Sequence, residues 1–285
     1  MTAPYARKRF GQHFLVQPAI AERIVDLAAL DGSGTALEIG PGRGALTDLL
    51  AARATRLVLV EVDRDLAAAL RVRFATSSTV EVIEGDVLRL DLAAHLEAVA
   101  PVSVVANLPY NISTPVLMQL LGTPQLFTRL VLMLQREVAE RICAAPGGKD
   151  YGGLSIVVQV VATARIAMRV PPGAFSPVPK VESAVVVIEP LHPAPLDAAQ
   201  RRALRHVVRT AFSRRRKQMQ NVIAPLTDDP YGVLGALGID PKARPETLSP
   251  AHFVRLSEAL GGQPRAESEE RKAESGKRKA ESSDL

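Results

Sequence analysis

Apolar residues along the chain fall into short, nearly continuous runs that alternate with longer segments in which they recur at helical spacing. Such runs are typical of strands buried on both faces of a sheet. They lie at 35–40, 56–63, 79–86, 102–108, 129–135, 154–164 and 182–190. Helical periodicity is clearest at 18–28, 45–54, 64–75 and 113–121. Strands that alternate with helices predict an α/β fold with a parallel, doubly wound sheet of seven strands.

The pattern changes after residue 190 and predicts a domain boundary. Residues 190–197 contain three prolines, which favour an extended linker. Asp197 and Gln200 have the spacing of a capping box. The helix that follows carries an apolar face of Leu204, Val207, Val208, Ala211 and Phe212. We therefore predict an α/β domain over 1–190 and a small α-helical domain over 191–262. Apolar residues nearly vanish over 263–285, so we predict a disordered tail there.

The composition is that of an ordinary globular protein, with 47% apolar and 23% charged residues in a chain of 285. These values exclude collagen-like, coiled-coil and mostly disordered chains. No apolar run approaches the roughly 18 residues of a membrane-spanning helix, and no apolar segment near the N-terminus suggests secretion. Cys143 is the only cysteine, so it makes no internal disulfide and no cysteine-rich zinc site. We predict a cytoplasmic protein with no metal ion and no membrane partner.

A glycine-rich turn, GPGRG at 40–44, follows the first strand of the predicted sheet. Gly40 and Gly42 allow positive φ angles and a close approach of the backbone to a ligand. A tight turn without a ligand has the same pattern, and enzymes that bind NAD use a similar one. Here the second half of the GxGxxG pattern and a Walker-type lysine are missing, so phosphate binding is not indicated. A cofactor such as S-adenosylmethionine fits this turn better than NAD or ATP.

Two acidic residues end the next two predicted strands. Glu61 is suited to accept hydrogen bonds from both ribose hydroxyls of a nucleoside cofactor, and Asp86 to accept one from the adenine amino group. Either acid alone is equally typical of a solvated strand end. Because the carboxyl ends of parallel strands meet at one edge of a sheet, we expect the glycine turn and both acids to lie together there.

Asn107, Leu108, Pro109 and Tyr110 end the fourth strand and are the candidate catalytic residues. The Asn107 oxygen and the Leu108 carbonyl can accept both hydrogens of an exocyclic amine, and the following proline restricts the direction of that carbonyl. The Tyr110 ring can stack on a base. Phe175 lies in a loop stiffened by prolines and is a candidate for the opposite wall, although a loop phenylalanine is more often part of the core.

Lysine and arginine number 35 against 30 acidic residues, a net charge of +5, so their distribution matters more than their excess. The basic residues gather in an N-terminal arm, a stripe at helical spacing and a cluster that follows it. These are Arg7, Lys8 and Arg9, then Arg201, Arg205 and Arg209, then Arg214, Arg215, Arg216 and Lys217. A charged helix face is usually only solvated. Few acidic residues interrupt this one, which favours contact with RNA phosphates.

Seven motifs occur in order along the chain. They are RFGQHFL (9–15), LEIGPGRGALT (37–47), VEVDRD (60–65), EGDVL (84–88), NLPYNIS (107–113), FSPVPKVESAVV (175–186) and AFSRRRKQ (211–218). Each is moderately specific, but the ordered set is a strong signal. Together they resemble the small-subunit ribosomal RNA adenine N6,N6-dimethyltransferases, and the resemblance spans about residues 7–260.

The resemblance implies a class I S-adenosylmethionine-dependent methyltransferase, with a Rossmann-like catalytic domain followed by an RNA-binding helical domain. It also implies a role for each matching residue. His13 and Leu15 would close over the methionine part of the cofactor, Gly40 and Gly42 would lie beneath it, Glu61 would hold the ribose, Asp86 the adenine, and Asn107 the cofactor edge and the target amine. Tyr110 and Phe175 would flank the target base. The family commonly has Asn where His13 stands.

By the same resemblance, the activity is methyl transfer from S-adenosylmethionine to N6 of two adjacent adenosines near the 3′ end of 16S rRNA, either as the RNA itself or in the immature 30S subunit. Nothing in the sequence suggests more than a monomer. Two alternatives remain. One is a relative that dimethylates large-subunit rRNA, although NLPYNIS, VPKVESAVV and RRRKQ favour the small-subunit group. The other is a non-catalytic RNA-binding assembly factor on the same fold, against which the intact Gly40, Glu61, Asp86 and NLPY argue.

Overall fold

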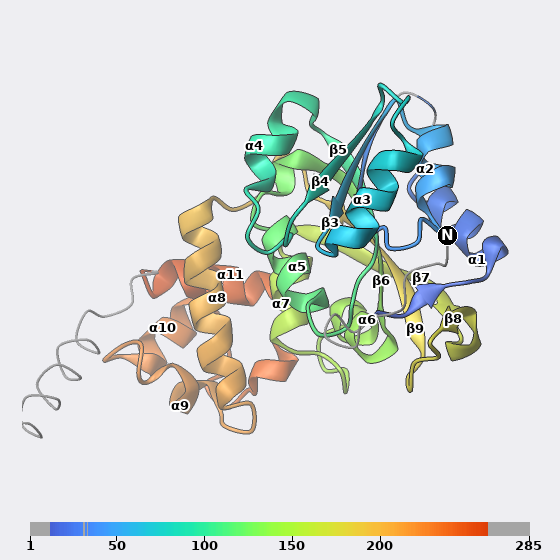
Figure 1. Ribbon diagram of the computed structural model, residues 1–285. Coiled ribbons are helices and arrows are strands. Elements are labelled where there is room, and N and C mark those ends of the chain that lie inside the picture. Colours follow the sequence, from blue (N-terminus) through green and yellow to red (C-terminus); the bar gives the residue numbers. More distant parts are fainter. Residues whose placement is uncertain (1–11, 31, 33, 262–285) are drawn as a thin grey trace, which may run out of the picture. The chain divides into compact units, whose positions relative to one another are not determined.

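The computed structural model describes residues 12–30, 32 and 34–261, and its largest feature is a seven-stranded sheet (Figure 1). The strands lie in the order β4-β3-β2-β5-β6-β9-β7. Their bounds are β2 Thr35–Ile39, β3 Arg56–Glu61, β4 Val80–Glu84, β5 Val102–Asn107, β6 Phe127–Gln135, β7 Ala162–Val170 and β9 Ser183–Pro190. A separate two-stranded sheet pairs β1, Phe14–Leu15, antiparallel with β8, Phe175–Ser176. The prediction of a doubly wound, seven-stranded sheet is confirmed.

The direction in which the chain builds the sheet reverses at β2. From β2 the chain adds β3 and β4 on one side and then returns to add β5 and β6 on the other side, all of them parallel. In the pairing of β2 with β5, Ile39 lies opposite Ala106, so Gly40 and Asn107 follow at neighbouring carboxyl ends. Ligands of open α/β sheets bind in the crevice at such a switch point.

Helices connect the strands and cover the sheet (Figure 1). Up to residue 195 the structure has α1 Pro18–Leu27, α2 Thr47–Arg53, α3 Arg64–Arg73, α4 Leu92–Leu96, α5 Ser113–Leu120, α6 Arg136–Cys143 and α7 Gly153–Gln159. Short 3-10 helices occupy Glu97–Val99, Pro124–Leu126 and Pro172–Ala174. Pro18 suits the first turn of α1, where an amide N–H would lack a helical partner. Ile24 and Val25 of α1 share one buried cluster with Leu59 of β3 and Val105 of β5, so α1 covers the central strands.

The prediction of a strand over 154–164 is wrong. This stretch contains α7, and the strand β7 begins only at Ala162. A short apolar run cannot be assigned to helix or strand by periodicity alone. Contacts at the start of α7 favour the helix here, because Gly152 N donates to the Ser155 hydroxyl at 3.0 Å and that hydroxyl donates to Arg141 O at 2.5 Å.

The strand over 183–190 also differs from the prediction, which made the whole sheet parallel. β9 pairs antiparallel with both β6 and β7. A parallel neighbour of β7 would need a crossover connection, whereas the segment between Val170 and Ser183 contains only a 3-10 turn and β8. The antiparallel arrangement follows from that connection.

The chain divides between Pro195 and Leu196, inside the proline-rich segment at 190–197, and the second unit is helical. Its helices are α8 Ala198–Ser213, α9 Met219–Ile223, α10 Pro230–Ala236 and α11 Pro250–Ala259, with a 3-10 turn at Pro245–Thr247. The predicted capping box is present, because Asp197 and Gln200 each accept a hydrogen bond from the other's backbone N–H at 2.8 Å. The predicted apolar face of α8 is buried, apart from Phe212, which is half-buried with its ring 6.0 Å from that of Phe253 in α11.

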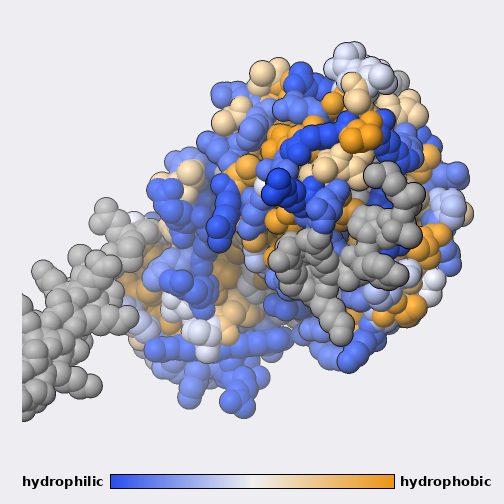
Figure 2. Space-filling view, viewed as in Figure 1, coloured by the Kyte–Doolittle hydropathy of each residue, from blue (hydrophilic) through white to orange (hydrophobic). Residues whose placement is uncertain are grey.

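Hydrophilic side chains cover much of the visible face of this helical unit, at the lower left of Figure 2. Among the described residues, no helix is long and apolar enough to span a membrane. The predicted tail over 263–285 lies outside the described residues.

Candidate functional site

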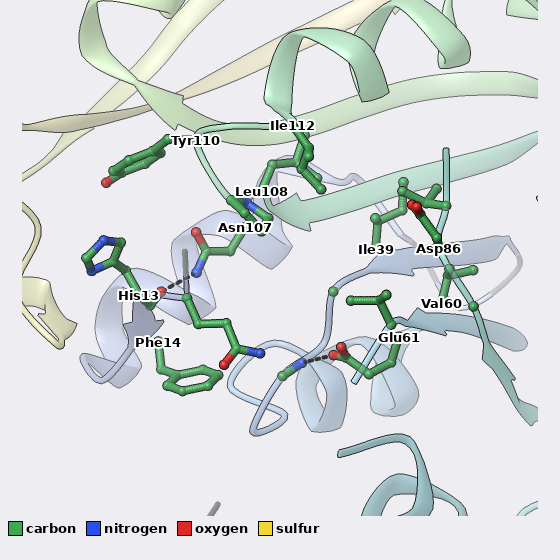
Figure 3. Close-up of a pocket in the computed structure, with 17 residues that line it drawn as sticks. His13, Phe14, Ile39, Val60, Glu61, Asp86, Asn107, Leu108, Tyr110 and Ile112 are labelled. Atoms are coloured by element: carbon green, nitrogen blue, oxygen red, sulfur yellow. Dashed lines mark hydrogen bonds between the residues drawn. The ribbon is translucent and has the colours of Figure 1, made fainter. Parts of the chain in front are cut away.

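An open cavity of about 730 Å³ lies at the carboxyl edge of the sheet, at the switch point between β2 and β5 (Figure 3). Its walls come from the loops after β2, β3, β4 and β5 and from the segment that leads into β1. Of the predicted site residues, nine line it: His13, Gly40, Gly42, Glu61, Asp86, Asn107, Leu108, Pro109 and Tyr110.

The glycine turn brings bare backbone to the floor of the cavity. Gly40 has φ +69°, and no heavy atom beyond its chain neighbours lies within 4 Å of the position that a Cβ would occupy. Gly40 N donates to Val60 O at 2.9 Å, which fixes the turn against β3. A ligand can therefore approach the backbone at Gly40 more closely than a side chain would permit.

Glu61 links the glycine turn to the loop after β3. Its Oε2 accepts a hydrogen bond from Gly42 N, and its Oε1 accepts one from Asp63 N, both at 2.9 Å. The side chain is only 3% exposed, and burial raises its pKa, while the two backbone donors oppose that rise. A carboxylate offers about four acceptor positions, so this one retains capacity for ligand hydroxyls.

Asp86 follows β4, in a loop that also lines the cavity. Its Oδ1 accepts a hydrogen bond from Leu88 N at 3.0 Å, and its Oδ2 lies 3.6 Å from Arg89 Nε. The loop after β4 thus holds the carboxylate by its own backbone. Ile39, Val60 and Ile112 add apolar side chains to the lining of the same cavity (Figure 3).

Asn107 is oriented by the N-terminal segment. Its Nδ2 donates to the carbonyl oxygen of His13 at 3.0 Å. A carbonyl only accepts, so the NH₂ end of the amide must face His13, and Oδ1 is the acceptor end turned away from that bond. The residue is half-buried and lies at the end of β5, where the strand supports its backbone.

Tyr110 contacts two side chains that the sequence did not connect to it. Its ring stacks on that of His13, with centroids 5.6 Å apart and planes 26° apart (Figure 3). Its hydroxyl shares a hydrogen bond of 2.8 Å with the Ser183 hydroxyl at the start of β9. His13 Nδ1 in turn donates to Pro177 O at 2.7 Å. Ser183 lies within the motif at 175–186, but nothing in the sequence indicates its partner.

Leu15 and Phe175 lie away from this cavity. They face each other in the β1–β8 ladder, are 5% and 3% exposed, and belong to the main hydrophobic cluster. Phe175 is not among the described residues that line the cavity, and its place beside the target base stays a prediction. Leu15 lines a smaller adjoining cavity, together with Gly40 and Asn107.

Phe14 is a site residue that the sequence analysis did not select. It lines the cavity, and its ring lies 3.0 Å from the position that a Cβ on Gly42 would occupy. The Arg43 guanidinium lies 4.5 Å from the centre of the same ring. Its place in the motif at 9–15 is the signal that could have identified Phe14 as a site residue. An apolar residue beside His13 is, however, equally typical of the hydrophobic core.

Comparison with known proteins agrees with this geometry. The sequence model of the family "Ribosomal RNA adenine dimethylase" matches residues 4–261. The chain belongs to this family. Curated relatives named "Ribosomal RNA small subunit methyltransferase A" include one from Geobacter sulfurreducens, 45% identical over 90% of this chain and 95% of the relative. Another, from Pseudomonas aeruginosa, is 42% identical over 91% of this chain and 96% of the relative.

Solved structures show the same fold. A dimethyladenosine transferase from Plasmodium falciparum superposes with a TM-score of 0.75 at 28% identity, over 86% of this chain and 96% of that one. The 23S rRNA methyltransferase ErmE gives a TM-score of 0.67 at 25% identity, over 87% and 99%. The present chain therefore has the class I fold of S-adenosylmethionine-dependent methyltransferases.

Only some of the basic residues that are predicted to contact RNA lie in the part of the chain that the structure describes. Arg7, Lys8 and Arg9 lie outside it. On α8, Arg209 is exposed, whereas Arg201 and Arg205 are half-buried. Burial and the neighbouring charges of Arg201 and Arg202 lower the pKa of Arg205.

The cluster after α8 is exposed and partly paired within the helical unit. Arg214 Nη1 donates to Asn221 O at 3.3 Å, and Arg215 Nε lies 2.6 Å from a Glu246 oxygen. Arg216 and Lys217 are exposed as well. Like charges thus crowd one end of α8 and the turn beyond it, an arrangement suited to an anionic partner.

Proposed function

We propose that this protein transfers methyl groups from S-adenosylmethionine to N6 of two adjacent adenosines near the 3′ end of 16S rRNA and so forms dimethyladenosine. The observation that carries the proposal is the meeting, in one open cavity, of the Gly40 turn, two acids and the Asn107–Tyr110 segment. The close relatives, named as small-subunit methyltransferases, support the choice of RNA.

The cavity fits an adenosyl cofactor that carries no phosphate. Gly40 provides exposed backbone, Glu61 provides acceptors for ribose hydroxyls, and Asp86 provides an acceptor for the adenine amino group. Among the described residues that line the cavity, none is lysine or arginine, so its charged side chains attract a sulfonium cation rather than a phosphate. His13 and Leu15 belong to the N-terminal segment that borders the methionine end in this proposal, and Gly42 supports the ribose contact through Glu61.

Asn107 and Leu108 present acceptors to the target amine. When bound, S-adenosylmethionine would supply an electrophilic methyl group on its sulfonium sulfur. The N6 lone pair would attack the methyl carbon in line, so that an N–C bond forms as the C–S bond breaks, leaving a thioether and one extra proton on nitrogen. The exocyclic amine is a poor nucleophile because its lone pair is delocalised into the purine. Asn107 Oδ1 and Leu108 O accept its two hydrogens, turn the lone pair toward the methyl group and stabilise the charge that develops on nitrogen.

Positioning accounts for much of the rate in this mechanism. Holding two reactants in line can contribute roughly 7–11 kcal/mol. Pro109 restricts the Leu108 carbonyl, and Tyr110 stacks on the base. No strong general base is required, since the alkylated amine loses its proton to water. A base must leave its stack to reach this cavity, so an RNA loop or single strand is the natural substrate.

The basic residues supply contacts to RNA phosphates. In this proposal Arg201, Arg205 and Arg209 on α8, the exposed cluster at 214–217 and the N-terminal Arg7, Lys8 and Arg9 position a partly assembled 30S subunit without reading its sequence. The protein acts in the cytoplasm as a monomer. Light scattering after gel filtration would test the monomeric state.

The decisive experiment is transfer of labelled methyl from S-adenosylmethionine to 30S subunits that lack the modification, followed by digestion and identification of the nucleosides by mass. Dimethyladenosine in small-subunit RNA supports the proposal. Methylation of 23S rRNA instead would assign the protein to the group represented by ErmE, to which it is 25% identical. No transfer to either RNA, with no binding of the cofactor in calorimetry, would favour a non-catalytic RNA-binding factor.

A further inference from the structure

Ser183 is a fully buried polar residue (0% exposed) for which the catalytic scheme above has no role. It occupies the first position of β9, an interior strand whose pairing sets Ser183 opposite Gln135 of β6 and Val170 of β7. Its backbone therefore has a paired strand on each side. Its hydroxyl shares the hydrogen bond of 2.8 Å with Tyr110.

Tyr110, by contrast, belongs to the short connection between β5 and α5. Its ring is half-buried, with one face against the His13 ring and its edge near the rim of the cavity. A tyrosine in such a connection rotates about Cα–Cβ unless its far end is held. The Ser183 hydroxyl holds that end.

The same ring is coupled to the acceptor that orients the amine. The His13 ring lies against Tyr110, and the His13 carbonyl holds the Asn107 amide at 3.0 Å. A shift of the Tyr110 ring therefore moves the surface on which a base would rest relative to the Asn107 oxygen. The bond from β9 fixes the far end of the ring, while the His13 ring lies against one face.

We propose that Ser183 is the positioning residue for Tyr110: it fixes the far end of the base-stacking ring and thereby the approach of the target amine to Asn107. This inference rests on the proposed function for the identity of the base. It assigns no chemical step to Ser183, which acts only through the Tyr110 hydroxyl. The predicted consequence is a defect in substrate engagement rather than in cofactor binding.

The test compares Ser183→Ala, Tyr110→Phe and the double variant as full-length proteins acting on unmodified 30S subunits. Each single variant should raise KM for the subunit roughly 2- to 10-fold, the range that one lost hydrogen bond supports, with the Kd for S-adenosylhomocysteine unchanged. Because both changes remove the same bond, the double variant should be no worse than either single one. Ser183→Thr, which keeps the hydroxyl, should restore KM.

A spectroscopic readout separates positioning from general destabilisation. The chain has four tyrosines, so protein labelled with 3-fluorotyrosine gives few ¹⁹F resonances, and Tyr110→Phe identifies the one from Tyr110. Ser183→Ala should shift that resonance alone. Ser103→Ala is the matched control, since Ser103 is a buried serine of β5 whose hydroxyl bonds with Thr128 at 3.1 Å; it should leave both KM and the Tyr110 resonance unchanged.

A wild-type KM in Ser183→Ala, or effects of the two single variants that multiply in the double variant, would overturn the inference. Should Ser183→Ala not fold, Tyr110→Phe carries the test, because it removes only the phenol oxygen, and an unchanged KM there would also overturn it. If the wild-type protein methylates no RNA, that result counts against the proposed function instead. The ¹⁹F shift would still decide whether Ser183 holds the Tyr110 ring.

Discussion

Replacing Glu61 by glutamine hardly changes the size of the side chain, yet the hydrogen bonds around it make the substitution disruptive. The two carboxylate oxygens accept from Gly42 N and Asp63 N, each at 2.9 Å. Glutamine has one acceptor oxygen, so its NH₂ group must face one of these backbone N–H donors. At 3% exposure, water does not readily replace the lost acceptor.

The expected magnitude follows from these contacts. A buried donor left without an acceptor destabilises by about 1–3 kcal/mol. The neutral amide offsets part of this, because burial raises the pKa of Glu61 and so opposes its charged form. We expect Glu61→Gln to lower the free energy of unfolding by about 1–2 kcal/mol. The lost charged acceptor should also weaken cofactor binding by about 10- to 100-fold.

Urea unfolding followed by circular dichroism measures the first effect, and calorimetric titration with S-adenosylhomocysteine measures the second. Glu84→Gln is the matched control, because Glu84 ends the neighbouring strand β4 but is exposed, and its carboxylate pairs with Arg71 at 3.0 Å. That variant should change the free energy of unfolding by at most about 1 kcal/mol. If both variants unfold at the same urea concentration and bind the ligand equally, the backbone bonds to Glu61 do not organise the site.

Three further predictions concern other parts of the molecule. Asn107→Ala should lower kcat by about 100- to 1,000-fold while RNA affinity in filter binding is retained, and equal loss of both would mean that Asn107 holds RNA rather than the reacting amine. Arg205→Ala combined with Arg209→Ala should weaken RNA binding and reduce the slope of log K against log salt by about 1–2, whereas an unchanged slope would identify an ordinary solvated helix face. Burial raises the pKa of Glu38 from 4.5 to about 8, so the Glu38 carboxyl binds a proton more tightly in the folded protein than in the unfolded one. The free energy of unfolding therefore falls as pH rises from 4.5 through about 8. Glu38→Gln should flatten that fall in urea titrations between about pH 5 and pH 8, and parallel curves for the two proteins would contradict the assignment.

Local chemistry explains why most elements were predictable from the sequence. The strands that end at Ile39, Glu61 and Asn107 are apolar runs bounded by turn residues, and each is followed by a helical pattern, which favours buried strands of an α/β protein. The capping box at Asp197 and Gln200 is a contact between residues three apart, so its spacing alone specifies it. The prediction of a strand over 154–164 failed because its apolar residues suit a helix as well as a strand. The contact with Arg141 favours the helix.

The sequence by itself determined which loops carry the site, because the carboxyl ends of parallel strands must meet at one edge, whatever the details of packing. It could not determine which side chains touch across long stretches of chain. The hydrogen bonds of Asn107 with His13 and of Tyr110 with Ser183, and the pairing of β1 with β8 that buries Phe175, are tertiary contacts. Each of these joins residues far apart in sequence, and their energies exist only once the chain has folded. Tertiary structure therefore decided which aromatic rings line the cavity, while local sequence decided where the cavity lies.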